Sequence, residues 1–139
     1  MTPPRFELDA FRDRMSEGSF ANGLDLAQDG SVALIALEDE IVTAHVQGGE
    51  LYVVELRPPA EGTCTCPGFD KFGACKHQVG VAAAVNALDT AGLHKAQSRM
   101  ARLRDGLALE SQDALIERLV ELARLRPDVL AGLEGGREP

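Results

Sequence analysis

The stretch from Cys64 to His77 places the tightest constraint on how this chain folds. It reads CTCPGFDKFGACKH and holds every cysteine of the 139 residues, spaced as C-x-C, eight residues, then C-x-H. Three thiolates and one imidazole complete a tetrahedral shell around Zn²⁺ and leave no position open for a substrate. The spacing therefore predicts a closed zinc site whose ligands are Cys64, Cys66, Cys75 and His77.

The residues around the four ligands suit this interpretation. Within the loop, proline and glycine allow the chain to turn back, and two phenylalanines can fold over the metal: Pro67, Gly68, Gly73, Phe69 and Phe72. Residues 78–88, QVGVAAAVNAL, form a helix-favouring run, so Cys75 and His77 are expected at a helix N-terminus. The positive end of the helix dipole favours thiolate over thiol there.

Other uses of the three cysteines fit the spacing less well. Three is an odd number, so disulfide pairing would leave one thiol over, and neighbours in C-x-C bridge each other only with strain. A redox or nucleophilic cysteine would explain neither the third thiol nor the C-x-H spacing. His45 and His94 compete with His77 as the fourth ligand, but neither has another ligand residue type nearby.

The motif resembles the SWIM-type zinc fingers, whose pattern is C-[ST]-C-P, a variable loop and then C-K-H. Residues 64–67 and 75–77 match the two halves, and YVVEL at residues 52–56 resembles the Y-x-V strand that precedes the first cysteine in this family.

The resemblance to bacterial members of the family extends upstream and covers about residues 20–88. Residues 20–23 (FANG) and 30–32 (GSV) are similar to segments of those members. Leu24 and Leu26 stand where many bacterial relatives carry an aromatic residue, which affects packing.

The formal net charge of −8 is unevenly distributed along the chain. Residues 1–60 carry four arginines against eleven acids, a net charge of −7, and residues 71–104 carry six cations against Asp89, a net charge of +5. An acidic protein is repelled by phosphate at long range, and a charge run is usually a solvated helix face. The candidates for a nucleic-acid contact are Lys71, Lys76, Lys95, Arg99, Arg102 and Arg104.

The remaining segments predict a small α+β fold. Three β-favouring runs indicate a three-stranded antiparallel meander over residues 32–37, 41–46 and 51–56. Polar residues 38–40 form its first turn, and Gly48 and Gly49 are expected to adopt positive φ in its second. Prolines 58 and 59 end the sheet or leave it running on only as an edge. The zinc loop leads into a helix that covers the apolar face of the sheet through Val81, Ala84, Val85 and Leu88.

Helices are expected at both ends of the chain. An amphipathic helix over residues 6–17 is interrupted at Gly18 and Ser19, and a short helical turn covers residues 20–27. Further helices follow over residues 91–108, after an N-cap at Ser111, and from Pro127 to Leu133. We therefore expect a zinc-binding domain at 1–110, a helical extension packed on it at 111–134 and a flexible tail at 135–139.

The sequence argues against catalysis and against a membrane location. It lacks a phosphate-binding glycine motif and any spacing that supports a Ser/His/Asp arrangement, so we expect neither an enzyme nor a small-molecule substrate. It has no run of eighteen apolar residues and no signal-peptide pattern at its N-terminus, and cysteines kept for metal fit a reduced, cytoplasmic setting.

The resemblance to SWIM-type fingers implies DNA or protein binding. Such fingers occur in chromatin-remodelling-type helicases, transposases and ubiquitin-pathway proteins. Because the net charge is acidic and few aromatic side chains are present to stack on bases, we expect a protein-interaction module that is accessory to a nucleic-acid-processing complex, with a helicase-type protein as a candidate partner. The alternatives are direct DNA binding through residues 71–104 and redox sensing by zinc-bound thiolates.

Overall fold

A computed structural model describes residues 4–135 and divides the chain into two compact units between Met100 and Ala101. The boundary lies inside helix α5 (Thr90–Ala108), before the boundary expected at residue 110. The expected packing of residues 111–134 on the preceding domain stays a prediction. No helix within residues 4–135 is both long and apolar enough to span a membrane.

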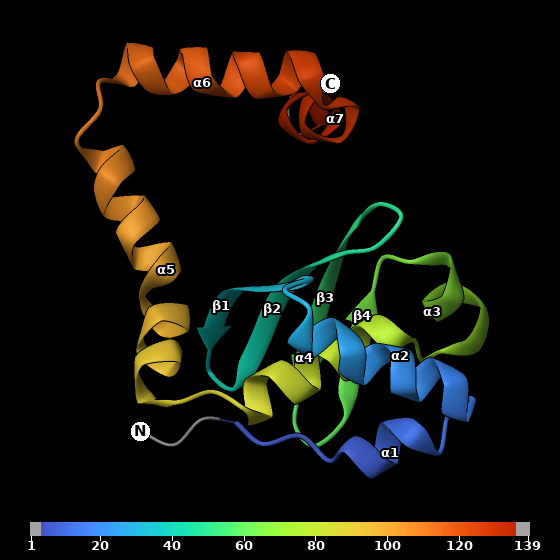
Figure 1. Ribbon diagram of the computed structural model, residues 1–139. Helices are drawn as coiled ribbons and strands as arrows, with labels where there is room; N and C mark the ends of the chain where they lie inside the picture. The colour runs from blue at the N-terminus through green and yellow to red at the C-terminus, as the bar shows by residue number, and fades with distance from the viewer. Residues whose placement is uncertain (1–3, 136–139) are drawn as a thin grey trace. The chain divides into compact units, whose positions relative to one another are not determined.

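The first unit is built on an antiparallel sheet of four strands, where the sequence predicted three. The strands follow the chain in the order β1 (Val32–Glu38), β2 (Ile41–Gln47), β3 (Leu51–Arg57) and β4 (Glu61–Cys64) (Figure 1). The additional strand β4 pairs with β3 from Arg57↔Glu61 to Val54↔Cys64. Pro58 and Pro59, joined by a cis peptide bond, lie in the turn before β4. Their missing N–H groups therefore interrupt no strand pairing, and the sheet continues.

The core lies between one face of this sheet and helix α4 (Lys76–Asn86), which also packs against helix α2 (Glu17–Gln28). Alternate residues of the two central strands are fully buried: Val42, Ala44, Val46, Val54 and Leu56. The helix after His77 is the predicted partner of the sheet, and Val81 and Val85 are buried as expected, whereas Ala84 and Leu88 remain partly exposed. Because α4 is covered by α2 as well, its buried surface is wider than one stripe.

The predicted break in the N-terminal helices was placed wrongly. Helix α1 spans Leu8–Arg12, and α2 begins at Glu17, so the break falls at residues 13–16. The Ser16 hydroxyl accepts a hydrogen bond from the Ser19 N–H at 3.1 Å. This N-cap starts the helix early, and Gly18 and Ser19 lie inside its first turn.

The first two of the three β-hairpins reverse the expectation about positive φ. Asp39 (φ 52°) and Glu40 (φ 67°) adopt the left-handed conformation between β1 and β2. Gly48 and Gly49, between β2 and β3, are not among the described residues with positive φ. A type I′ two-residue turn needs positive φ at both central residues, and the chain places such a turn in the first hairpin.

The second unit is helical. Helix α6 (Gln112–Leu125) begins after Ser111, whose hydroxyl accepts from the Ala114 N–H at 3.1 Å, which confirms the predicted N-cap. Helix α7 (Pro127–Gly135) starts with the predicted proline. The tail expected at residues 135–139 lies outside the described residues, apart from Gly135 at the end of α7.

Candidate metal centre

The four predicted ligands come together from three neighbouring elements. Cys64 is the last residue of β4, Cys66 is the N-cap of helix α3 (Pro67–Phe72), Cys75 is the N-cap of α4, and His77 lies in the first turn of α4. Their ligand atoms all lie within 4.8 Å of one another, and all four side chains are buried. The fold thus gathers residues that are up to thirteen positions apart into one cluster.

Helix α3 shapes the loop between the two ligand pairs. Its N-terminus is capped by Cys66, whose sulfur accepts from the Phe69 N–H at 3.3 Å. Gly73 ends the helix with φ 75°, and its N–H donates to the Phe69 carbonyl at 2.7 Å. The left-handed conformation at Gly73, which glycine adopts at little cost, turns the chain back toward Cys75. The sequence indicated the turn but not the helix.

The side chain of Gln78 holds the backbone of the ligand residue Cys75. The sequence did not lead us to predict this role. The Gln78 side-chain oxygen accepts from the Cys75 N–H at 3.1 Å, and the residue is only 1% exposed. This bond satisfies a backbone donor that the start of a helix leaves without a partner. The signal was present in the sequence, since glutamine three residues after an N-cap is the pattern of a capping box.

Tyr52 and Gly48 surround the imidazole of His77. The Tyr52 ring lies 4.7 Å from the His77 ring between centroids. A Cβ atom at Gly48 would lie 3.3 Å from the His77 Nε2. Nδ1, by contrast, lies 3.8 Å from the Cys64 sulfur, so this nitrogen faces the cysteines.

The spacing of these atoms fits zinc. Bond lengths of about 2.3 Å to sulfur and 2.0 Å to nitrogen in a tetrahedron place the two ligand atoms about 3.5 Å apart. The 3.8 Å between the Cys64 sulfur and the His77 Nδ1 is close to that value. A donor set of three sulfurs and one imidazole also suits Zn²⁺ better than it suits the oxygen-seeking Mg²⁺ or Ca²⁺.

The protonation of the cluster depends on whether a cation is bound. A hydrogen bond with the Cys75 side chain and, after it, burial raise the pKa of the Cys64 thiol to about 12. Without metal, this thiol therefore keeps its proton at neutral pH. A divalent cation stabilises the thiolate and displaces the proton, so the cluster is suited to hold metal rather than a free reactive thiolate.

The two phenylalanines of the loop, Phe69 and Phe72, differ in solvent exposure. Phe69 is partly buried and packs against the core, whereas Phe72 is 69% exposed. The expectation that both fold over the metal is therefore wrong for Phe72.

The competing histidines stay apart from the cluster: His45 lies in β2, and His94 is exposed on α5.

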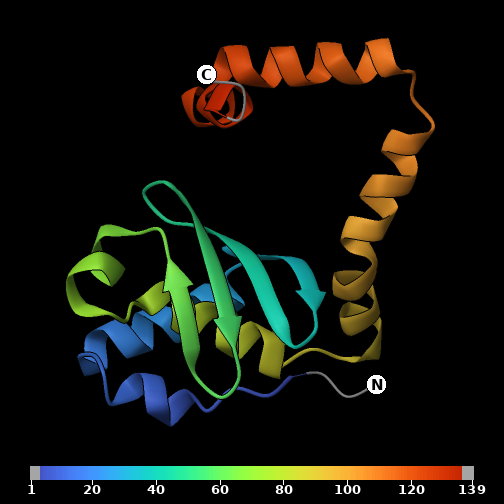
Figure 2. The ribbon, with the colours of Figure 1, turned by 180° about the vertical axis from the view of Figure 1, so that it is seen from behind.

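The structure does not gather the six basic residues on one face. Lys71 lies in α3 and Lys76 begins α4, whereas Lys95 and Arg99 lie in the first part of α5. Figures 1 and 2 show α3 and the start of α5 at opposite ends of the sheet. The remaining two cations, Arg102 and Arg104, belong to the second unit.

Comparison with known proteins identifies the segment that carries the cluster. The family model of the SWIM zinc finger matches residues 52–86, which run from β3 to the end of α4. Comparisons with curated proteins and with solved structures give no match. The matched segment contains all four clustered side chains. Residues 52–86 of this chain therefore form a SWIM zinc finger, and zinc is its cofactor.

Proposed function

We propose that this protein is a non-catalytic, zinc-stabilised interaction module that serves a nucleic-acid-processing complex through a protein partner. In this proposal Cys64, Cys66, Cys75 and His77 hold one Zn²⁺. The observation that carries it is the closed cluster of four buried ligand side chains. A shell of three thiolates and an imidazole leaves no coordination position for a substrate.

The metal, when bound, would act as a structural cross-link. The ligands belong to β4, to the N-cap of α3 and to the start of α4, so coordination ties the sheet edge to the central helix. The same helix carries the buried side chains Val79, Val81 and Val85 of the core. Zinc coordination and core packing therefore support the same arrangement of the finger.

An exposed aromatic side chain beside the finger supports a protein partner. Phe72 is 69% exposed and borders a groove of about 400 Å³ beside the ligand cluster, which Tyr52, Lys76 and the ligand residues Cys66, Cys75 and His77 also line. Aromatic side chains beside a pocket are typical anchors of protein interfaces. The alternative, direct DNA binding, gains less support because Lys71 and Lys76 are separated from Lys95 and Arg99.

Metal analysis tests the structural part of this proposal. We expect about one equivalent of zinc per chain after mild purification. A cobalt-substituted sample should show the thiolate-to-metal charge-transfer bands of a tetrahedral site. Much less than one equivalent, or an octahedral cobalt spectrum, would contradict the closed ligand set.

Site-specific photo-crosslinking in the source cells tests the interaction part. A photoreactive phenylalanine analogue at position 72 should capture a protein of nucleic-acid processing. The same analogue at Glu61, an exposed residue at the start of β4, serves as the matched control and should not capture it. Cross-links from position 72 to nucleic acid alone would favour the DNA-binding alternative, and no cross-link to any protein would contradict the proposal.

A further inference from the structure

The second unit exposes more apolar surface than its helices cover by themselves. Its exposed large hydrophobic side chains on α6 and α7 range from 44% to 68% exposed: Ile116, Leu119, Val120, Leu122, Leu125, Leu130 and Leu133. Within residues 101–135, Ala123 is the single buried residue. Clusters of exposed apolar side chains of this kind mark interaction sites.

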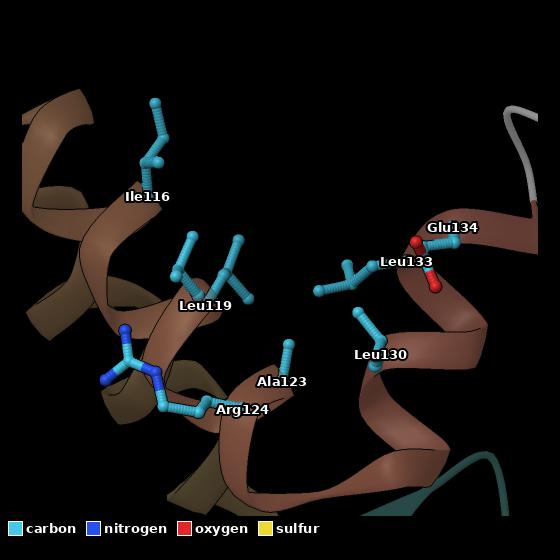
Figure 3. Close-up of a pocket in the computed structure, with 8 residues that line it drawn as sticks. Ile116, Leu119, Ala123, Arg124, Leu130, Leu133 and Glu134 are labelled. Carbon is cyan, nitrogen blue, oxygen red and sulfur yellow. The ribbon is translucent and has the colours of Figure 1, made fainter.

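Five of these exposed side chains, together with Ala123, line one groove between α6 and α7, with a volume of about 550 Å³. Ile116, Leu119, Val120 and Ala123 follow the i, i+3, i+4, i+7 spacing of one helix face. Leu130 and Leu133 extend from α7 toward that face (Figure 3). The groove is therefore an apolar surface made entirely by the second unit.

The size of the unit indicates that the groove needs an occupant. The unit comprises residues 101–139, just under the roughly 40 residues below which a chain usually needs disulfides, metal or oligomerisation to fold. The clustered zinc ligands all belong to the first unit, so the metal does not stabilise the second. Association with another helical surface would bury the apolar side chains that the unit leaves exposed.

The charges at the groove indicate which helical surface packs against it. The two charged side chains that line it have opposite signs, Arg124 on α6 and Glu134 on α7. A twofold dimer brings the same patch of each copy together, so a residue i that contacts j also has its j in contact with i. Arg124 of one copy can then pair with Glu134 of the other, twice per dimer. Arg124 already contacts Glu121 of its own helix, but such surface ion pairs are weak and exchangeable.

We propose that the apolar surface of α6 and α7 around this groove is a homodimerisation surface. It packs against the same surface of a second copy of this chain. Leucine, isoleucine and valine side chains form the centre of the interface, and Arg124 and Glu134 form its rim. This inference goes beyond the zinc finger and its proposed partner, because it concerns the second unit alone. It also explains why these side chains are exposed in one copy.

The mass of the full-length, zinc-loaded chain in solution tests the proposal. Light scattering at micromolar concentration should give twice the 14.8 kDa of one chain. Replacing Leu119 and Leu130 together by glutamine, which keeps helix propensity, should give a monomer with unchanged zinc content. The matched control Leu109→Gln changes a leucine that is 90% exposed in the same unit but outside the groove, and it should stay dimeric.

Charge reversal tests the twofold pairing at the rim. Arg124→Glu alone and Glu134→Arg alone should each weaken the dimer by roughly threefold to tenfold. The two changes combined should restore it, since the opposite charges again meet across the axis. A monomeric wild-type chain at about 100 µM, or a dimer that survives the Leu119 and Leu130 changes, would overturn the proposal and assign the groove to another partner or to the first unit.

Discussion

Cys75 has more than one structural role at the scale of single residues. Its sulfur belongs to the ligand cluster, and its backbone begins α4 as the N-cap. Its N–H is held by the buried side chain of Gln78. Position, backbone direction and metal coordination are therefore coupled at one residue, and a change there affects all three.

Replacing Cys75 by serine should unfold the finger. The hydroxyl preserves the size of the side chain but is a poor zinc ligand, and structural zinc contributes folding free energy directly. We expect a loss on the order of 5 kcal/mol, comparable with the whole stability of a small domain. Urea unfolding followed by circular dichroism, with zinc content measured in parallel, gives this value. Thr65→Ser is the matched control, because it keeps the hydroxyl that accepts from the Val53 N–H, and a cooperative fold in Cys75→Ser would show that the metal is peripheral.

Gly48 and Gly49 offer a second test beside the imidazole. An added Cβ at Gly48 would lie 3.1 Å from Cε2 of Tyr52 and 3.3 Å from Nε2 of His77. We expect Gly48→Ala to lower the free energy of unfolding by about 1 kcal/mol through overpacking. At Gly49 an added Cβ meets nothing within 4 Å, so Gly49→Ala should be neutral or slightly stabilising. Equal denaturant midpoints for the two variants would show that the ring pair moves freely.

At the scale of elements, α4 is the helix on which the first unit depends. It packs against α2 on one side and against the sheet on the other. The close approach of α2 requires glycine at position 23, where a Cβ would lie 2.6 Å from the Val79 Cβ and 2.7 Å from the Lys76 carbonyl oxygen. Because one of these neighbours is backbone, a side-chain rotation cannot relieve the clash.

A pair of alanine variants on α2 measures this packing. Gly23→Ala should destabilise the protein by about 1–3 kcal/mol, because it separates two packed helices. Gly18→Ala lies on the same helix, with nothing within 4 Å of its added Cβ, and should stabilise by up to about 1 kcal/mol through helix propensity. Thermal unfolding of both variants should therefore show shifts of opposite sign. A Gly23→Ala protein as stable as the wild type would mean that α2 and α4 do not pack this closely.

Local signals predicted the elements well where local chemistry decides them. The three runs of β-favouring residues became β1, β2 and β3, and Ser111 and Pro127 mark the starts of α6 and α7. The start of α2 after its N-cap Ser16 was missed because Gly18 suggested an interruption, whereas the side-chain cap overrides one poor helix former. Strand β4 was missed because its short sequence EGTC has little β propensity of its own and is held by pairing with β3.

The candidate site was predictable in its ligands but not in its surroundings. Cys64, Cys66, Cys75 and His77 follow from spacing, because the metal demands those atom types close together. The contact of Tyr52 with His77 joins β3 to α4 and depends on the tertiary fold. The exposure of Phe72 was equally unpredictable from the sequence. It depends on where α3 ends and on which face of α3 packs against the core.

At the scale of the whole molecule, the distribution of charge limits the affinity that the chain can have for nucleic acid. The net charge is −8, which repels phosphate at long range. The local excess of cations over residues 71–104 does not become one continuous patch, since α3 and the start of α5 lie at opposite ends of the sheet. Arg99 is partly engaged as well, because it donates to the Leu34 carbonyl at 3.2 Å.

We therefore predict weak binding of the isolated chain to DNA. Of the six candidate cations, each end of the first unit carries two, Lys71 with Lys76 and Lys95 with Arg99. Two phosphate contacts give a salt slope of about −1.8, and binding at physiological salt should be no tighter than the ~10⁻⁴ to 10⁻⁶ M of non-specific association. Fluorescence anisotropy of a labelled duplex at two salt concentrations measures both quantities.

Charge-reversal variants decide whether any observed affinity is specific. Lys95→Glu combined with Arg99→Glu removes the cations of one end, and Lys71→Glu removes one at the other end without changing a zinc ligand. If binding is only electrostatic, each variant weakens it modestly, in proportion to the charge removed. Submicromolar binding that survives physiological salt and is lost in one variant alone would contradict the prediction. It would assign that end of the sheet to DNA, because a few exposed cations on an acidic protein cannot hold a duplex at that salt unless shape and hydrogen bonding contribute too.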